Sequence, residues 1–259
     1  MRYALVNDAR RKAAPGLVGR CPGCSQQTVA KCGIQRTWHW AHRGNRPCDA
    51  WWGAETIWPR GWKNQFPPEW QEIIRHDETG EKHIADVMTK HGHVIEFQHS
   101  YLPAQQRDSR ERFYKKMIWL VNGLRLKNDR RRFFESDNLF RVPFSVDVFV
   151  TRNPERCMPS AWVNCTKPVL FDFEGFAAPE GAPKALEGKL WCLLPGRVDS
   201  YAVVVAVSRA WFLDAAWNRE QIIPTQAIGW FVHNRLSARH RNYAHDPNFR
   251  RRGRRRRRF

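Results

Sequence analysis

A short segment rich in cysteine and histidine constrains the fold of this chain more than any other feature. Residues 21–48 hold four of the seven cysteines and two histidines among turn-forming and basic residues, with few aliphatic side chains. Apolar burial cannot hold such a segment together, so a cross-link of another kind is needed. A Cys-x-x-Cys turn is followed by the two histidines, which is the ligand pattern of a tetrahedral structural zinc site.

The predicted Zn²⁺ ligands are two thiolates and two imidazoles. They are Cys21, Cys24, His39 and His42. Cys32 and Cys48 compete for the second half of the site, since the pair of His42 and Cys48 would also give a plausible spacing. A redox role is the alternative for the Cys-x-x-Cys turn, but no thioredoxin-like βαβ pattern surrounds it. Structural zinc is the favoured interpretation.

The chain is strongly basic. Lys and Arg number 44 and Asp and Glu 25, for a net charge of +19. Residues 250–258 supply eight arginines, which leaves +11 (19 minus 8) on the rest of the chain. Such a charge attracts polyanions, and no amphipathic helix rich in Lys and Leu indicates a membrane surface. DNA, single- or double-stranded, is therefore the expected partner, and Arg254 and Arg255 of the Arg-rich tail are candidate contacts.

Cysteine content and apolar runs indicate the compartment. Seven cysteines are an odd number, the N-terminus lacks the apolar core of a secretory signal, and the aliphatic run Val203–Val207 is too short to cross a bilayer. We expect a reducing cytoplasm and no membrane. The sequence leaves open whether the chain forms a homo-oligomer or binds a partner protein.

Two short β-rich runs, residues 83–87 and 93–98, form the pattern that bears most on chemistry. A Gly-containing turn joins them, as in an antiparallel hairpin. A polar helix over 104–116 and a buried strand over 117–121 are predicted next. The order strand, strand, helix, strand indicates an α/β core. Ahead of it, residues 55–74 are predicted to be helical, with interruptions at Pro59 and at Pro67–Pro68.

Carboxylates on the hairpin suggest a second metal site. Asp86 and Glu96 lie on neighbouring strands and can face one cleft, and the period of two places Gln98 beside Glu96. Mg²⁺ prefers oxygen ligands and can activate water for phosphodiester hydrolysis, so we predict a site for Mg²⁺ or Mn²⁺. A solvent-facing carboxylate pair is the alternative, although Glu96 sits between two large apolar residues, where a charge is disfavoured.

Four stretches, together with the cysteine module, carry a family resemblance. They are His83–Val87, Ile95–Ser100, Arg110–Tyr114 and Ile118–Trp119. In these stretches the chain resembles the CoiA-like competence nuclease family, within the PD-(D/E)XK superfamily, over about residues 20–125. The resemblance implies that Asp86 and Glu96 are metal ligands and that Glu55 on the preceding helix completes the acidic site. It also places Gln98 where most PD-(D/E)XK nucleases carry a lysine.

The missing lysine calls for a cation from elsewhere. Gln98 can orient water but carries no charge. Lys63 lies two helical turns after Glu55 on the same helix face, and it could supply the cation if Pro59 does not bend the helix away. The predicted catalytic set is Asp86, Glu96, Gln98, Glu55 and Lys63.

Arg110 and Tyr114 lie one turn apart on the polar helix and are candidate contacts to nucleic acid. A surface helix with a solvated arginine is the equally weighted alternative.

Two classes of function follow from these patterns. The first is a metal-dependent DNA endonuclease or exonuclease, acting in DNA uptake and processing or in anti-phage defence. The second is a catalytically inactive DNA-binding module with the same fold, because Gln98 replaces a charged residue. RNA is a weaker partner, since no strand carries an aromatic RNA-recognition signature.

The expected fold is mixed α/β (α+β). It comprises a small zinc-finger-like module over residues 1–50 and a PD-(D/E)XK restriction-endonuclease-like core over 51–150. A β-rich C-terminal extension of unknown role over 151–245 and a disordered Arg-rich tail over 246–259 complete the predicted division.

Overall fold

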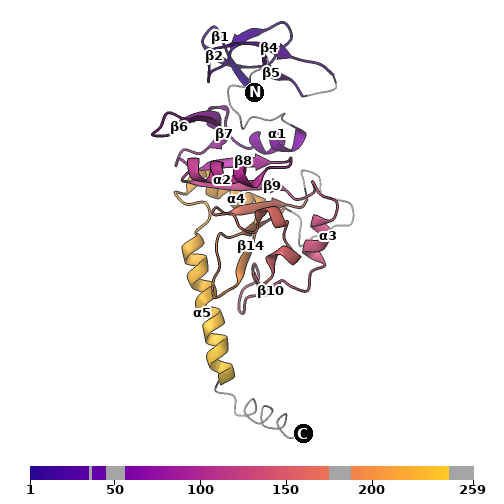
Figure 1. Ribbon diagram of the computed structural model, residues 1–259, viewed down its shortest axis with the longest axis vertical. Helices are drawn as coiled ribbons and strands as arrows, with labels where there is room; N and C mark the ends of the chain where they lie inside the picture. Colours follow the sequence, from indigo (N-terminus) through magenta and orange to yellow (C-terminus); the bar gives the residue numbers. More distant parts are fainter. Residues whose placement is uncertain (35–36, 45–55, 175–187, 245–259) are drawn as a thin grey trace.

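The computed structural model describes residues 1–34, 37–44, 56–174 and 188–244. Within these ranges the chain forms two sheets and a few helices, which is the mixed α and β composition expected (Figure 1). The smaller sheet lies at one end of the molecule, above the larger sheet. No helix in the described ranges combines the length and apolar character needed to cross a membrane.

The smaller sheet holds the cysteine-rich segment. Its strands are β1 (Tyr3–Val6), β2 (Ala9–Lys12), β3 (Val18–Arg20), β4 (Gln27–Lys31) and β5 (His39–His42), in the spatial order β2-β1-β3-β4-β5. All described pairings are antiparallel. The core is small, with Cys21 and Trp40 both fully buried beside Ala4. A core of this size agrees with the need for a further cross-link.

The larger sheet has nine strands. They are β6 (Gln71–His76), β7 (Lys82–Met88), β8 (Val94–Gln98), β9 (Met117–Asn122), β10 (Phe140–Arg141), β11 (Val148–Thr151), β12 (Val169–Asp172), β13 (Lys189–Leu193) and β14 (Ala202–Ser208). Their spatial order is β10-β11-β14-β13-β12-β9-β8-β7-β6. Strands β8, β9 and β12 are mutually parallel, and the other neighbours are antiparallel. The sheet therefore runs across the boundary predicted at residue 150.

Helices cover both faces of the larger sheet. They are α1 (Ile57–Lys63), α2 (Ala104–Phe113), α3 (Asp129–Phe134), α4 (Arg209–Asn218) and α5 (Thr225–Ala244), with short 3₁₀ turns at Pro68–Trp70, Pro154–Arg156 and Ser160–Trp162. On one face Trp62 of α1 contacts Phe97 of β8 and Phe212 of α4. On the other face α3 packs Phe133 against Trp191 of β13. Each face thus has its own aromatic core.

The predicted hairpin and crossover are present. Strands β7 and β8 are antiparallel, α2 follows, and β9 pairs with β8 in parallel, as the order strand, strand, helix, strand requires. The helix predicted over 104–116 ends at Phe113, because Tyr114 has extended backbone angles.

The segment before the hairpin differs from the prediction. Pro59 does not interrupt α1, since it lies in the first turn, where its missing N–H is not needed. Residues 71–76 form strand β6 instead of helix. Pairing with β7 decides this difference, since it supplies a hydrogen-bonded neighbour for two adjacent β-branched residues, Ile73 and Ile74.

The two sheets are joined by specific contacts. The Glu72 carboxylate accepts the backbone N–H of Arg2 at 2.7 and 2.9 Å and that of Tyr3 at 3.2 Å. Arg10 donates to the Gln71 carbonyl at 2.7 Å. These bonds attach β1 and β2 to the start of β6.

Candidate functional site

The two predicted catalytic carboxylates meet where strands β7 and β8 separate. Regular pairing extends only to Val87 opposite Ile95. Beyond this point side chains replace the ladder, because Asp86 N–H donates to Glu96 Oε1 at 3.2 Å and Phe97 N–H donates to Asp86 Oδ2 at 3.0 Å. The two carboxylates are thereby fixed beside each other by backbone donors.

A different cation approaches each carboxylate. Lys63 Nζ, at the end of α1, lies 2.7 Å from Asp86 Oδ1, and Arg110 Nη1 of α2 lies 3.0 Å from Glu96 Oε2. The side chains of Lys63, Glu96 and Arg110 are at most 9 % exposed, whereas that of Asp86 is 27 % exposed. The helices on the two faces of the sheet thus converge on one cluster, which opens to solvent at Asp86.

Glu96 is destabilised as an anion. Burial and the neighbouring Asp86 carboxylate raise the pKa of Glu96 to about 8, and the attraction of Arg110 opposes this only in part. Two carboxylates held together in a poorly solvated place repel each other, which favours protonation or a bound cation.

Gln98 is buried beside this cluster with its amide already oriented. Its Nε2 donates to the backbone carbonyl of Ser100 at 2.9 Å and to the Ser100 hydroxyl at 3.2 Å. Among the described residues, none donates a hydrogen bond to Gln98 Oε1, so this carbonyl oxygen can accept a hydrogen bond from water or coordinate a cation.

The other residues predicted to act in catalysis or in nucleic-acid binding lie in different parts of the chain. Glu55, Arg254 and Arg255 lie outside the described residues. Arg110 and Tyr114 are 7 % and 4 % exposed, so the surface-helix alternative is wrong for both. Their contact with nucleic acid stays a prediction.

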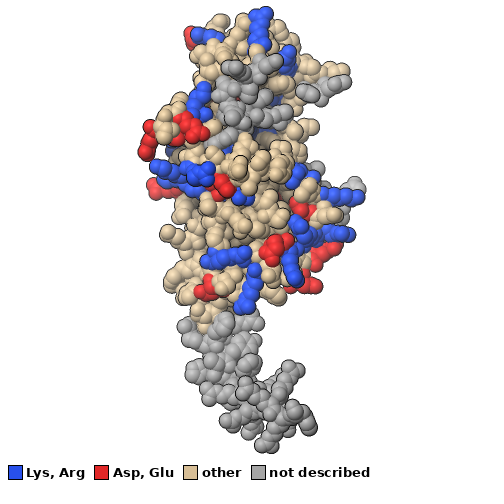
Figure 2. All heavy atoms as spheres, viewed as in Figure 1, with Lys and Arg blue, Asp and Glu red and all other residues tan. Residues whose placement is uncertain are grey.

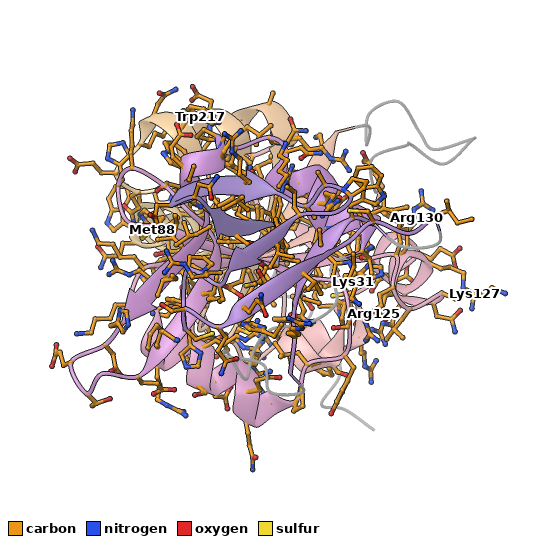
Figure 3. The ribbon with its side chains drawn as sticks, turned by 90° about the horizontal axis from the view of Figure 1, so that it is seen from above. Lys31, Met88, Arg125, Lys127, Arg130 and Trp217 are labelled. Carbon is orange, nitrogen blue, oxygen red and sulfur yellow. The ribbon has the colours of Figure 1, made fainter. Side chains whose placement is uncertain are left out.

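Tyr114 nevertheless borders a basic hollow. A cavity of about 680 Å³ next to the end of α2 is lined by Tyr114 with Arg75, Arg112, Lys115 and Lys116, and by Asp77 and Glu78. Two further basic residues, Arg125 and Lys127, are exposed in the segment between β9 and α3, and Arg130 follows them on α3 (Figure 3). Lys and Arg are spread over several parts of the visible face (Figure 2).

Cys21, Cys24 and His42 form the group in the smaller sheet that could hold a structural metal such as zinc. Their ligand atoms lie within 4.8 Å of one another, with Cys24 Sγ and His42 Nε2 at 3.3 Å. The N–H of Gly23 donates to Cys21 Sγ at 3.3 Å, which fixes the turn. Burial, the chain's terminal ammonium and Lys82 lower the pKa of His42, which favours the neutral imidazole that a metal ligand requires.

His39 does not join this group. In strand β5 alternate residues share a face, so His42 lies on the same face as buried Trp40, and His39 on the other. His39 Nδ1 is instead 2.9 Å from the Thr37 carbonyl. The expectation of four ligands that include His39 is therefore corrected to three described ligands. Cys32 is described but lies outside the group, and Cys48 is outside the described residues.

A buried anchor for α1 was not anticipated from the sequence. Asp172, at the end of β12, is fully buried and accepts the indole N–H groups of Trp58 and Trp62, each at 3.0 Å. Arg209 of α4 contacts the same carboxylate at 2.6 Å. A carboxylate flanked by Phe171 and Phe173 was the available signal, since it must find partners when the strand is buried. The network holds α1, and hence Lys63, against the sheet.

Comparison with known proteins adds one match. Residues 20–50 match the family model of the N-terminal domain of the competence protein CoiA. This stretch contains Cys21, Cys24 and His42, and the match supports a relation to CoiA-like proteins. No curated protein and no solved structure matches the chain.

Proposed function

We propose that this chain is a metal-dependent nuclease of the PD-(D/E)XK kind that hydrolyses DNA phosphodiester bonds, as an endonuclease or an exonuclease. The observation that carries the proposal is the pair of Asp86 and Glu96, held together by backbone donors in a poorly solvated place. Buried like charges are costly to stability, and such an arrangement is characteristic of functional sites. The name of the matched family suggests a setting in competence, the processing of incoming DNA.

The donor set fits a hard divalent cation. Asp86 and Glu96 offer only oxygen atoms to such an ion, which Mg²⁺ and Mn²⁺ prefer. The repulsion that raises the pKa of Glu96 would be relieved by the ion, and the exposed side of Asp86 offers a path of entry. When bound, the ion would neutralise charge on the phosphate and activate water.

The protein's own residues would divide the remaining tasks. Asp86 and Glu96 would hold the ion, while Arg110 fixes the orientation of Glu96. Gln98 Oε1 would accept a hydrogen bond from the attacking water and orient it. Lys63 would supply the positive charge that Gln98 lacks, from the end of α1 instead of from β8.

The cysteine group would have a structural role. Three ligands are brought together by the smaller sheet, and structural zinc sites use four. We propose that Zn²⁺ supplies the cross-link that the small apolar core cannot provide.

A DNA-binding module without turnover is the second candidate, and one observation favours it. Each carboxylate already has a cationic partner, Lys63 for Asp86 and Arg110 for Glu96, so the cluster can be neutral without a metal. On this alternative the pairs would be structural, and DNA would be bound but not cut.

Metal-dependent cleavage decides between the two. Linear, circular and single-stranded DNA, with matched RNA, would be incubated with the full chain in Mg²⁺ or Mn²⁺, beside the Asp86→Ala/Glu96→Ala double variant. We expect cleavage by the wild type and its loss in the variant, with DNA affinity in EDTA retained by both. Binding without cleavage in either metal would overturn the nuclease proposal and support the binding module.

A further inference from the structure

A second surface gathers arginine and aromatic side chains at the opposite edge of the larger sheet. Strand β10 is the last strand on that side, far in the strand order from β7 and β8. A cavity of about 560 Å³ lies between β10, the end of β11, the start of β14 and α5. Phe140, Arg141, Arg152 and Tyr201 line it, and no Asp or Glu is among its described lining residues.

The arginines of this surface are available for an anionic partner. The Arg152 guanidinium lies 4.8 Å from the centre of the Tyr201 ring, and that of Arg235, on α5, lies 5.3 Å from the Phe144 ring. Among the described residues, no carboxylate forms an ion pair with Arg141, Arg152 or Arg235. The nearby carboxylate of Asp199 is paired with His233 at 2.8 Å. Stacking on rings thus holds the guanidinium groups without neutralising them.

The aromatic rings of the same surface are unusually exposed. The exposed fraction is 59 % for Phe140 and 89 % for Phe144. Exposed rings gathered in one place usually mark a site of interaction. Free guanidinium groups beside uncovered rings match a chain of phosphates that carries unpaired bases, because arginine can contact the phosphates while the bases stack on the rings.

We propose that this arginine and aromatic groove, lined by Phe140, Arg141, Arg152 and Tyr201 and bordered by Phe144 beside Arg235, binds single-stranded DNA. The choice of DNA rests on the proposed nuclease function, but the binding itself requires no cleavage. A duplex would offer phosphates to the arginines and keep its bases stacked on one another, so the rings would stay uncovered. An apolar protein partner would leave the arginines unneutralised, which disfavours it.

The first experiment measures affinity separately from chemistry. Fluorescence anisotropy in EDTA would report binding of a labelled oligo-dT of about 20 nucleotides, an abasic strand of equal length, the matched duplex and oligo-rU. For the wild-type chain we expect oligo-dT to bind most tightly. Phe140→Leu/Phe144→Leu keeps apolar side chains but removes the rings, and we expect it to weaken oligo-dT binding about tenfold or more while the abasic strand is little affected.

Matched variants test the arginines. Arg141→Lys/Arg152→Lys keeps the charge and loses the planar stacking group, and a several-fold weakening for oligo-dT is expected. Arg219→Lys is the control, because Arg219 also stacks on an aromatic ring, that of Trp211, and neither residue lines the cavity. Thermal unfolding would verify that each variant is folded, which the exposure of both phenylalanines favours.

The outcomes separate this proposal from the nuclease proposal. Equal binding of oligo-dT and the abasic strand, unchanged affinity in the Leu double variant, or tighter binding of duplex or oligo-rU would each overturn the groove as a site for single-stranded DNA. If the wild-type chain cleaves no DNA but binds oligo-dT in a way that depends on the rings, the groove proposal stands and only the nuclease proposal is refuted.

Discussion

Lys63 and Arg110 occupy positions in the carboxylate cluster that spacing in the sequence could not assign. Lys63 reaches Asp86 because α1 ends directly beside the point where β7 and β8 separate. Arg110 faces inward to Glu96, although the helix around it is polar. In both cases the residue type suggested an interaction with charge, and packing selected the partner.

Replacement of Lys63 tests its proposed part in hydrolysis. We expect Lys63→Ala to lower the rate of metal-dependent DNA cleavage by roughly 10²–10³-fold, because one preorganised positive group near the reacting phosphate is lost. Lys63→Arg should recover part of the rate, and Lys90→Ala, in the exposed turn between β7 and β8, should not change it. Single-turnover kinetics at saturating DNA provide the measurement. An unchanged rate in Lys63→Ala would remove Lys63 from the catalytic set.

The pKa of Glu96 makes a prediction about stability. Folded Glu96 holds a proton up to about pH 8, whereas in the unfolded chain it ionises near its ordinary value of 4.5. The folded state therefore binds more protons between these values, and its stability falls as pH rises through that window. Below pH 4.5 both states are protonated and the effect vanishes.

Glu96→Gln removes this titration and should stabilise the metal-free protein. The measured quantity is the free energy of unfolding of the variant minus that of the wild type, both in EDTA. We expect this difference to be larger at pH 8 than at pH 5, by on the order of 1–3 kcal/mol. Urea unfolding at the two pH values, with Glu69→Gln as an exposed control, measures the difference. A difference between variant and wild type that does not change with pH would contradict the proposed proton uptake.

The geometry of strand β5 decides which of the two predicted histidine ligands faces the thiols. The Cys-x-x-Cys turn and the following histidines resemble a ligand set in which all four members count equally. A β-strand sends residues three apart to opposite faces, so only His42 can turn toward Cys21 and Cys24. A helix in the same place would have put both histidines on one side.

Zinc content should therefore separate the two histidines. His42→Ala is expected to lower bound zinc from about one ion per chain to near zero and to destabilise the smaller sheet, since the small core loses its cross-link. His39→Ala should keep the metal. Elemental analysis of the purified chains, with thermal unfolding, gives the readout. Loss of zinc in His39→Ala with retention in His42→Ala would reverse the assignment.

At the scale of the whole molecule, much of the positive charge lies in residues 246–259, outside the described core. Deletion of residues 246–259 removes eight arginines and none of the described core. We expect the slope of log affinity for duplex DNA against log salt to become shallower by several units, at most about 7, with little change in the cleavage rate at saturating DNA. A tail of equal length without arginine is the control. An unchanged slope would mean that the tail does not contact phosphate.

The larger sheet also joins parts that looked separate in the sequence. Strands β12 to β14 were predicted as an extension, yet β12 pairs directly with β9. Through Asp172 this later part of the chain also holds Trp58 and Trp62 of α1. The position of α1, and hence of Lys63, thus depends on a residue more than a hundred positions after Trp58 and Trp62, a relation that no local pattern indicates.

The sequence by itself determined the features that depend on residue type and on neighbours in the chain. The turn glycine and the β-rich runs beside it predicted β7 and β8, and the Cys-x-x-Cys turn predicted two of the three residues that could hold a metal. The polyanionic partner that the charge suggests stays a prediction. Tertiary structure alone decided the side chain that faces each carboxylate, the histidine that faces the thiols, and the edge of the sheet where arginines meet exposed rings. These outcomes depend on strand register, on which face a residue occupies and on long-range packing, and sequence spacing does not record them.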